Sequence, residues 1–296
     1  MAANKDTLAV IVVTADSGAS VLDGIDALLS SPQVDGLVIA DNASHDGMPQ
    51  RAVAKHADDA RLRLLANARN LGFGAAVNRA AATLHSDWLA IVNPDCVVTP
   101  EALASLMREA RAQANVGLLG ALMVDAQGHI DPASCRRDPL LRRVLVSFGL
   151  GHGEGVNVEG PIAPTSQSVQ AVSGAVLLLP RALFTQLGGF DEDYFLHFED
   201  LDLCRRVRDA GKEVYLVGGV RVVHGKGSSS QHRPVFVAWH KHRSMWRWLR
   251  KFDPAVRKPW LAALVFCGIG VHFVAVLPRL AWRGWRARRR SELSVG

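Results

Sequence analysis

The segment 87–98 constrains the fold more than any other part of the chain. Trp88–Val92 is an unbroken apolar run, which favours a strand buried on both faces of a parallel sheet. Pro94 has no backbone N–H and disfavours helix at Asn93, so the strand must end there. Asp95 follows, and open α/β sheets bind ligands beyond the carboxyl ends of their strands. The same letters could form an ordinary turn, and the flanking segments decide between the two.

Strands and helices are expected to alternate through the first part of the chain. Buried strands are predicted at 8–14, 36–40, 61–65 and 88–92, and helices at 20–29, 78–84 and 100–112. This alternation is typical of βαβ units, so we predict an α/β fold with a mostly parallel sheet flanked by helices.

Beyond Gly117 the regular alternation of strands and helices ends. Strands are predicted at 116–124, 169–179, 214–217 and 220–223, and helices at 181–187, 200–210 and 235–252. A turn signal at 125–128 indicates a hairpin or an extension of the sheet. Residues 149–168 are rich in Gly, Pro and Ser without periodicity, which predicts a long loop of functional or mobile character.

The segment 260–282 holds about twenty apolar residues, enough to cross a bilayer. Flanking tryptophans and basic residues resemble interfacial anchors, whereas His272 and Pro278 weaken a full span. A helix lying in the membrane interface, a single span and a buried core helix therefore remain open.

The formal charge of +6 and the isoelectric point near 9.5 point to an anionic partner. The excess of positive charge lies largely in a tail of six arginines: Arg279, Arg283, Arg286, Arg288, Arg289 and Arg290. Beside an apolar segment, such a tail favours an anionic membrane surface and not nucleic acid, for which no RNP-type motif is present. The four scattered cysteines suit a reducing compartment, and the polar segment 1–6 has no signal-peptide core, so we expect a cytoplasmic amino end.

Three loops follow the first, second and fourth predicted strands, at 14–18, 41–47 and 93–95. All three belong at the carboxyl edge of the sheet and can converge on one ligand. Asp41 can accept hydrogen bonds from a base or a ribose, and it can equally form an Asx-turn that caps the next segment. We expect it to do both.

A glycine-rich turn, Asn-Leu-Gly-Phe-Gly-Ala-Ala-Val-Asn at 70–78, runs into a helix. Backbone amides at a helix start suit a diphosphate, although the sequence is neither GxGxxG nor a Walker A motif. Farther on, Glu199, Asp200 and Asp202 cluster at a helix start, where capping explains one acid but not three. One of them could be a general base. His224 ends a strand, either as a structural residue or, paired with an aspartate, as a ligand of a divalent metal.

Together these segments resemble family 2 inverting glycosyltransferases of the GT-A fold, especially bacterial rhamnosyltransferase-like members. The resemblance covers about 8–243 and rests on the order and spacing of several short pieces. They are Val-Ile-Ala-Asp-Asn-Ala-Ser-His-Asp-Gly at 38–47, the turn at 70–78, Asn-Pro-Asp at 93–95, Ser-Gly-Ala at 173–175, Gly-Gly-Phe-Asp-Glu at 188–192, Phe-Glu-Asp-Leu-Asp-Leu-Cys-Arg-Arg at 198–206, and His224.

The resemblance implies a role for each matching residue. The donor, a nucleotide sugar, would be bound by Thr14, Asp16, Asp41, Asn42, Asn70, Gly72, Asn78 and Asn93. Asp95 and His224 would hold Mg²⁺ or Mn²⁺, Asp200 would be the catalytic base, and Gly174 and Glu199 would contact the acceptor. It also implies a glycosyltransferase domain at 1–233, with a nucleotide-sugar half of about 1–115 and an acceptor half of about 116–233, and a membrane-associating region at 234–296.

Two departures from the family pattern matter. Asn93 replaces the first acid of the common Asp-x-Asp motif, so Asp95 would hold the cation with fewer protein charges. Thr14-Ala15-Asp16 stands where Thr-Tyr-Asn is common, which removes an aromatic contact to the base.

A sugar-nucleotide pyrophosphorylase is an alternative function, but the segment 15–18 lacks the basic residue that such an enzyme needs. A processive polysaccharide synthase would need a Gln-x-x-Arg-Trp motif and several membrane spans. A catalytically degenerate, membrane-docked carbohydrate-binding protein is the non-enzyme alternative.

By analogy with the family, the donor would be dTDP-rhamnose and the acceptor a lipid-linked saccharide, in cell-surface polysaccharide synthesis. The expected location is the cytoplasmic face of the bacterial inner membrane, through peripheral binding or a single C-terminal anchor.

Overall fold

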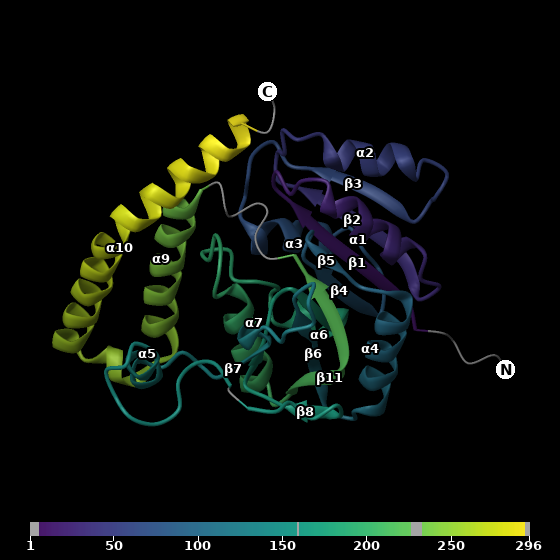
Figure 1. The fold of residues 1–296 in the computed structure, drawn as a ribbon. Helices are drawn as coiled ribbons and strands as arrows, with labels where there is room; N and C mark the ends of the chain where they lie inside the picture. Colours follow the sequence, from purple (N-terminus) through teal and green to yellow (C-terminus); the bar gives the residue numbers. More distant parts are fainter. Residues whose placement is uncertain (1–5, 159, 226–232, 294–296) are drawn as a thin grey trace.

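The computed structural model describes residues 6–158, 160–225 and 233–293, with side chains in the last helix as far as Arg286. One mixed sheet runs through the described chain in the order β3-β2-β1-β4-β10-β6-β11-β5, with β8 paired to β11 (Figure 1). Its strands are β1 (Leu8–Thr14), β2 (Val34–Asp41), β3 (Leu62–Ala66), β4 (Trp88–Val92), β5 (Cys96–Val97), β6 (Val116–Val124), β8 (Ser166–Ser168), β10 (Val176–Pro180) and β11 (Glu213–His224). A small second sheet pairs β7 (Cys135–Arg136) with β9 (Ala171–Val172).

Helices cover both faces of the sheet (Figure 1). They are α1 (Ser20–Leu29), α2 (Met48–Lys55), α3 (Phe73–Ala81), α4 (Pro100–Ala112), α5 (Leu141–Ser147), α6 (Arg181–Gln186), α7 (Glu199–Asp209), α9 (Pro234–Phe252) and α10 (Pro259–Leu293), with short 3₁₀ turns at Pro132–Ser134 and Pro254–Arg257. In β1, Ile11 joins the core cluster beneath α3, α7 and α9, whereas Val10 joins the cluster beneath α1 and α4. Burial on both faces explains why β1 and β4 carry continuous apolar runs.

The first four strands in the sheet order, β3, β2, β1 and β4, are parallel to one another, as predicted. β10 then runs antiparallel between β4 and β6. The turn at 125–128 closes a hairpin-like return, since Val124 bridges Ile130 in antiparallel sense. The proposed boundaries at 115/116 and 233/234 stay predictions.

Several expected elements differ in extent. The predicted strand at 169–179 is divided into β9 and β10, and the two strands predicted at 214–217 and 220–223 are one strand, β11, with a register shift between Val217 and Arg221. The helix predicted at 78–84 begins five residues earlier, at Phe73, because the glycine-rich turn leads straight into it. α2 and α5 were not predicted, and the loop 149–168 is irregular where described, apart from an isolated bridge at Asn157 and β8 at its end. The sequence after His224 is rich in glycine and serine, which predicts a loop, and most of it falls at 226–232, outside the described residues.

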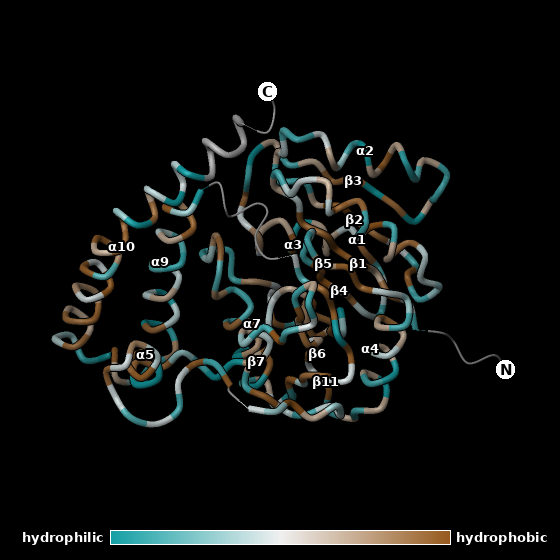
Figure 2. Tube along the Cα trace, in the orientation of Figure 1, coloured by the Kyte–Doolittle hydropathy of each residue, from teal (hydrophilic) through white to brown (hydrophobic). Residues whose placement is uncertain are grey.

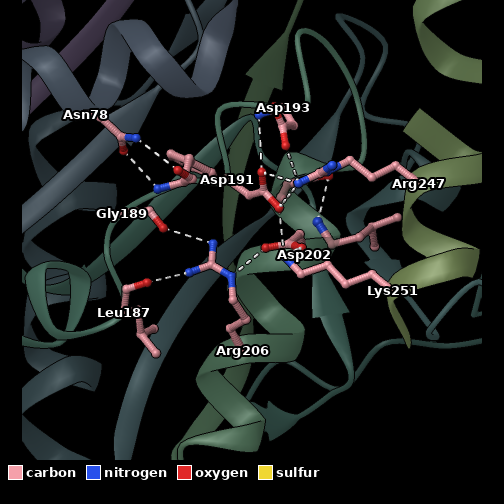
Figure 3. A network of polar contacts seen from close by, with 12 residues as sticks. Asn78, Leu187, Gly189, Asp191, Asp193, Asp202, Arg206, Arg247 and Lys251 are labelled. Carbon is pink, nitrogen blue, oxygen red and sulfur yellow. Dashed lines mark hydrogen bonds and ion pairs between the residues drawn. The ribbon is translucent and has the colours of Figure 1, made fainter. Parts of the chain in front are cut away.

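α9 is fastened to the sheet domain by a network of ion pairs (Figure 3). Arg247 pairs with Asp191 at 2.9 Å, and Lys251 contacts Asp191 at 2.7 Å and Asp202 at 2.5 Å. Asp202 is fully buried and also accepts a hydrogen bond from Arg206 at 2.5 Å. Of the three clustered acids, Asp202 is thus a structural residue.

We expect Asp202→Asn to lower the free energy of unfolding by about 3 kcal/mol, because it removes a buried charge and leaves Arg206 without its carboxylate partner, while Lys251 keeps Asp191. Asp209→Asn is the matched control on the same helix. Its ion pair with Arg205, at 2.8 Å, is half exposed, so its loss should cost less than about 1 kcal/mol. Urea unfolding of the two variants checks this, and equal effects would contradict the assignment.

α10 lies apart from the sheet and packs mainly on α9 (Figures 1 and 2). Its segment Pro259–Arg286 is long and apolar enough to cross a membrane, and only 11% of its most apolar window is buried. Trp260, Val271 and Trp285 are among its exposed apolar side chains. This exposure contradicts the buried-core-helix alternative. The side chains of Arg288, Arg289 and Arg290 are outside the described residues.

Candidate active site

The ends of β1 and β2 form a closed polar cluster at the carboxyl edge of the sheet. The pair register places Thr14 opposite Asp41, and Thr14 Oγ1 donates to Asp41 Oδ1 at 2.9 Å. Ser44 Oγ donates to the same oxygen at 2.5 Å, and Ser44 N donates to it at 3.2 Å, which is an Asx-type contact of the expected kind. Asp16, which adopts a φ of 51°, accepts a hydrogen bond from His45 N at 2.6 Å. The two loops are therefore cross-linked and present a rigid edge.

Asn42 holds the glycine-rich turn against this edge. Its Nδ2 donates to Gly72 O at 3.0 Å, and Gly72 N donates to Asn70 Oδ1 at 2.9 Å. Gly72 has a φ of 89°, and a Cβ there would lie 2.7 Å from Phe195 O. Only glycine permits this approach of the turn to the segment before α7.

An open cavity of about 680 Å³ lies beside this turn. Asn70 and Asn78 line it, together with Arg69, Arg79, Glu192 and Phe195. The Asn78 amide is engaged with the loop after α6, accepting from Phe190 N at 2.8 Å and donating to Glu192 Oε1 at 2.9 Å. Asn78 therefore contributes to the cavity by fixing its wall.

Asp95 and His224 meet because β5 pairs antiparallel with the end of β11, placing Cys96 opposite His224. His224 Nε2 lies 3.3 Å from Asp95 Oδ1. Asn93, which directly follows β4, donates its backbone N–H to Ala175 O at 2.8 Å and so links this turn to the segment between β9 and β10. The structure thus brings together the two residues predicted to hold a metal.

The donor set of this pair fits a divalent cation. A carboxylate oxygen and an imidazole nitrogen are ligand types that Mn²⁺ accepts, and Mg²⁺ usually uses one or two carboxylates with phosphates and water. Cys96 lies within the same group of atoms. Burial, with the Asp95 charge, raises the pKa of the Cys96 thiol well above its usual value, and sulfur is a soft ligand type that Mg²⁺ and Mn²⁺ do not prefer.

Glu199 and Asp200 form the second half of the site, at the start of α7. The two residues before them, His197 and Phe198, have φ values of 65° and 71°, a conformation that side chains rarely adopt. Both acids are buried, with 7% and 8% of their surface exposed. Two buried neighbouring carboxylates behind a strained turn are typical of a functional site.

Asp200 is held as an anion. Its Oδ2 accepts hydrogen bonds from Arg136 and from Gly174 N at 2.9 Å, and its Oδ1 accepts one from Leu201 N at 2.8 Å. Burial acts to raise the pKa of Asp200, but the charge and hydrogen bond of Arg136 outweigh it and hold the pKa below its usual value. A carboxylate offers about four acceptor positions, so one remains open on Oδ1.

Glu199 has the opposite environment. Burial, followed by the charge of Asp200, raises the pKa of Glu199 above its usual value. Its Oε2 is buried without a hydrogen-bond partner among the described residues. One acid is therefore charged and its neighbour neutral, and such a split identifies candidates for the acid and base roles.

The absence of a side chain at Gly174 leaves room for the Asp200 carboxylate. A Cβ at this position would lie 2.9 Å from Asp200 Cβ and 3.2 Å from Oδ2. A larger residue would displace the carboxylate and its hydrogen bond from Gly174 N. The Ser-Gly-Ala segment therefore shapes the pocket around Asp200.

Three arginines at the site were not predicted. Arg136 lies on β7 and contacts Asp200. No short sequence motif predicts the pairing of β7 with β9 that places it there. Arg69 and Arg79 line the cavity, and Arg79 is fixed by a 2.8 Å hydrogen bond to Asn67 Oδ1. The position of Arg69, just before the glycine-rich turn, is the sequence signal that could have predicted a cation in this cavity.

Comparison with known proteins decides the family. Residues 5–250 match the family described as "Glycosyltransferase like family 2". The N-acetylglucosaminyl-diphospho-decaprenol L-rhamnosyltransferase of Mycobacterium tuberculosis is 33% identical over 262 residues, covering 82% of this chain and 84% of that protein. The chain belongs to glycosyltransferase family 2. This family 2 enzyme is therefore a glycosyltransferase, and the pyrophosphorylase and carbohydrate-binding alternatives fall away.

Solved structures place this glycosyltransferase in the GT-A fold. The mannosyltransferase PcManGT from Pyrobaculum calidifontis, in complex with GDP-Man and Mn²⁺, has a TM-score of 0.59 at 18% identity, covering 94% of this chain and 74% of that one. The glucosyl-3-phosphoglycerate synthase of Mycobacterium tuberculosis, in complex with Mn²⁺, UDP-glucose and phosphoglyceric acid, has a TM-score of 0.55 at 17% identity, covering 83% and 79%. The fold prediction is confirmed, whereas the roles assigned to individual site residues stay predictions.

Proposed function

We propose that this enzyme transfers L-rhamnose from dTDP-L-rhamnose to a hydroxyl of a polyprenyl-diphosphate-linked saccharide, with inversion. The carrying observation is the 33% identity, over most of both chains, to a rhamnosyltransferase named for a diphospho-decaprenol acceptor. The split pair Glu199 and Asp200 supports it by supplying an ionised proton acceptor beside a neutral acid.

The donor is expected to bind along the carboxyl edge of the sheet. Asp41, Asn42 and Thr14 face the nucleoside, while Asn70, Gly72 and Asn78 line the adjoining cavity with Arg69 and Arg79. The arginines place positive charge where a diphosphate needs it. Asp16 is expected to contact the donor at the same edge, and its Oδ1 also accepts a hydrogen bond from His45 N, which fixes the loop.

Asp95 and His224 are the residues that would hold Mg²⁺ or Mn²⁺ beside the diphosphate. When bound, the cation would neutralise the negative charge that develops on the departing nucleoside diphosphate. The Mn²⁺ in both structural neighbours supports divalent-metal use, as does the donor set of this pair.

Asp200 takes the acceptor proton in this mechanism. The acceptor hydroxyl occupies the open position on Oδ1, and Asp200 removes its proton as the oxygen attacks the sugar from the face opposite the diphosphate. Arg136, Gly174 N and Leu201 N fix the carboxylate in one orientation. Glu199, neutral, donates a hydrogen bond to the acceptor.

The direct test is a transfer assay. Full-length protein in detergent is incubated with labelled dTDP-L-rhamnose, an N-acetylglucosaminyl-diphospho-polyprenol acceptor and Mg²⁺ or Mn²⁺, and label in the extracted lipid is measured.

We also propose that α10 holds the enzyme at the cytoplasmic face of the bacterial inner membrane. Its exposed apolar segment and the cations at its end, such as Arg283 and Arg286, suit an anionic membrane surface. Arg286 lies 4.0 Å from the Trp282 ring centroid, an arrangement suited to an interfacial anchor.

Truncation after Lys258 should release the protein from the membrane fraction and leave nucleotide binding unchanged. The cut is placed there because Val256 is fully buried and belongs to the main core, so an earlier cut would damage the fold. Fractionation of cells, with nucleotide binding to the soluble variant, checks this. Full-length protein in the soluble fraction without detergent would contradict membrane binding.

A further inference from the structure

One face of α9 lies beside the candidate active site. Phe236, His240 and Ser244 recur every four residues and so share a side of the helix. Ser244 Oγ donates to Leu196 O at 3.0 Å, and the His240 ring stacks on Phe195 with centroids 4.4 Å apart. Phe195 also lines the donor cavity, so this face of α9 borders the donor site.

The last turns of α10 cross the start of α9 (Figure 1). Residues of both segments line a second cavity. It measures about 540 Å³ and is mostly apolar, with walls from Val235 and Phe236 on α9 and from Leu280, Ala281 and Trp285 on α10. We name it the α9–α10 groove. Phe236 of this groove contacts Phe195 of the donor cavity edge to face, with centroids 5.7 Å apart. Contacting aromatic rings of Phe195, Phe236 and His240 therefore connect the walls of the two cavities.

Cationic side chains lie at and near the start of α9. Arg233 is at the rim of the groove, and Lys241 follows His240 on α9. Among the residues that the structure describes, no carboxylate makes an ion pair with Lys241. Desolvation, followed by the charge of Arg136, lowers the pKa of Lys241, and burial with the charge of Lys241 lowers the pKa of His197 to about 4. An anion bound here would relieve this crowding of positive charge.

We propose that the α9–α10 groove binds the polyprenyl chain of the lipid-linked acceptor, and that Lys241 and Arg136 bind its diphosphate. The inference rests on the proposed function and assigns its acceptor to a place on the molecule. The wall from α10 belongs to the candidate membrane segment, so the chain can enter from the bilayer. Arg136 pairs with Asp200, and Lys241 follows His240, whose ring contacts both Phe195 and Phe236. This arrangement fits the order of lipid, diphosphate and sugar in the acceptor.

The test compares two acceptors that carry the same saccharide diphosphate, one on a long polyprenyl chain and one on a short water-soluble alkyl chain. Ala281→Trp fills the groove, and Ala263→Trp is the matched control on an exposed part of α10 outside it. Lys241→Ala removes the diphosphate contact.

We expect Ala281→Trp to raise KM for the long-chain acceptor at least about tenfold. The indole would displace a few CH₂ groups of the polyprenyl chain from the groove, and the burial energy of those groups is enough to account for a tenfold loss of affinity. KM for the short-chain acceptor and for the donor should stay unchanged, and Ala263→Trp should behave as wild type. Lys241→Ala should raise KM for both acceptors. A wild-type KM of Ala281→Trp for the long-chain acceptor, or equal losses for both acceptors, would overturn the proposal.

A binding experiment separates this inference from the proposed function. A photoreactive polyprenyl diphosphate, added to full-length protein without donor, should label peptides from the start of α9 and from 280–285. If the enzyme transfers no rhamnose but labelling occurs there, the proposed donor or acceptor sugar is wrong and the groove assignment stands. Labelling elsewhere, or equal labelling by an acyl-chain phospholipid probe, overturns the groove assignment.

Discussion

Replacing Asp200 with Asn is expected to lower kcat by about 10²- to 10⁴-fold with little change in donor affinity. The substitution keeps the shape of the side chain and removes the proton acceptor. Because the proposed function places Asp200 at the acceptor, the donor pocket should keep its contacts. Steady-state kinetics together with a donor-binding measurement check both parts of this prediction.

Glu199→Gln is the matched comparison. Glu199 is already neutral in the resting site, so the amide imitates its protonation state and should cost about tenfold or less. A collapse of turnover in Glu199→Gln with near-normal turnover in Asp200→Asn would move the base one residue back.

The pH profile distinguishes the two acids independently. The pKa of Asp200 lies below its usual value, so a rate that depends on the Asp200 anion is constant above about pH 5. The pKa of Glu199 is raised to about 8. A rate that depended on the Glu199 anion would therefore rise with pH across neutrality. We expect kcat/KM of the wild type to be flat across neutrality.

Asp95→Ala is expected to lower kcat/KM by about 10²-fold or more and to weaken metal-dependent donor binding. Removing a ligand leaves the charge of the diphosphate poorly compensated. His224→Ala should act in the same direction with a smaller effect, since a neutral imidazole compensates no charge. Titration of Mn²⁺ into each variant, followed by donor affinity, checks this.

Cys96→Ala is the control for the metal site. The thiol lies in the same group of atoms, but sulfur is a soft ligand type that Mn²⁺ does not prefer, so its removal should leave the affinity for Mn²⁺ unchanged. Undiminished turnover of the wild type in excess EDTA would contradict metal assistance altogether.

The sequence predicted the first half of the fold well because its signals there are local. The apolar run of β4 ends at Pro94, and the register between β1 and β2 places Thr14 beside Asp41, as parallel strands that end together must. The acids at the start of α7 were also visible, since their spacing within one helix turn needs no knowledge of the rest of the chain.

The parts that could not be predicted depend on contacts between distant segments. Arg136 becomes a partner of Asp200 only because β7 pairs with β9 and α7 packs beside them. The antiparallel sense of β10 follows from its place between β4 and β6, which no periodicity reveals. The groove between α9 and α10 requires two helices to cross, and hydrophobic patterning does not set their crossing.

Transfer of labelled rhamnose from dTDP-L-rhamnose to N-acetylglucosaminyl-diphospho-polyprenol tests the proposed function most directly. With purified full-length enzyme and Mn²⁺ or Mg²⁺, we expect label in the extracted lipid and one dTDP released for each rhamnose transferred, with neither seen for Asp200→Asn on the same timescale. Other nucleotide sugars should give little transfer. No labelled lipid from dTDP-rhamnose, alongside efficient transfer from another donor or to an acceptor without a lipid diphosphate, would contradict the proposed function.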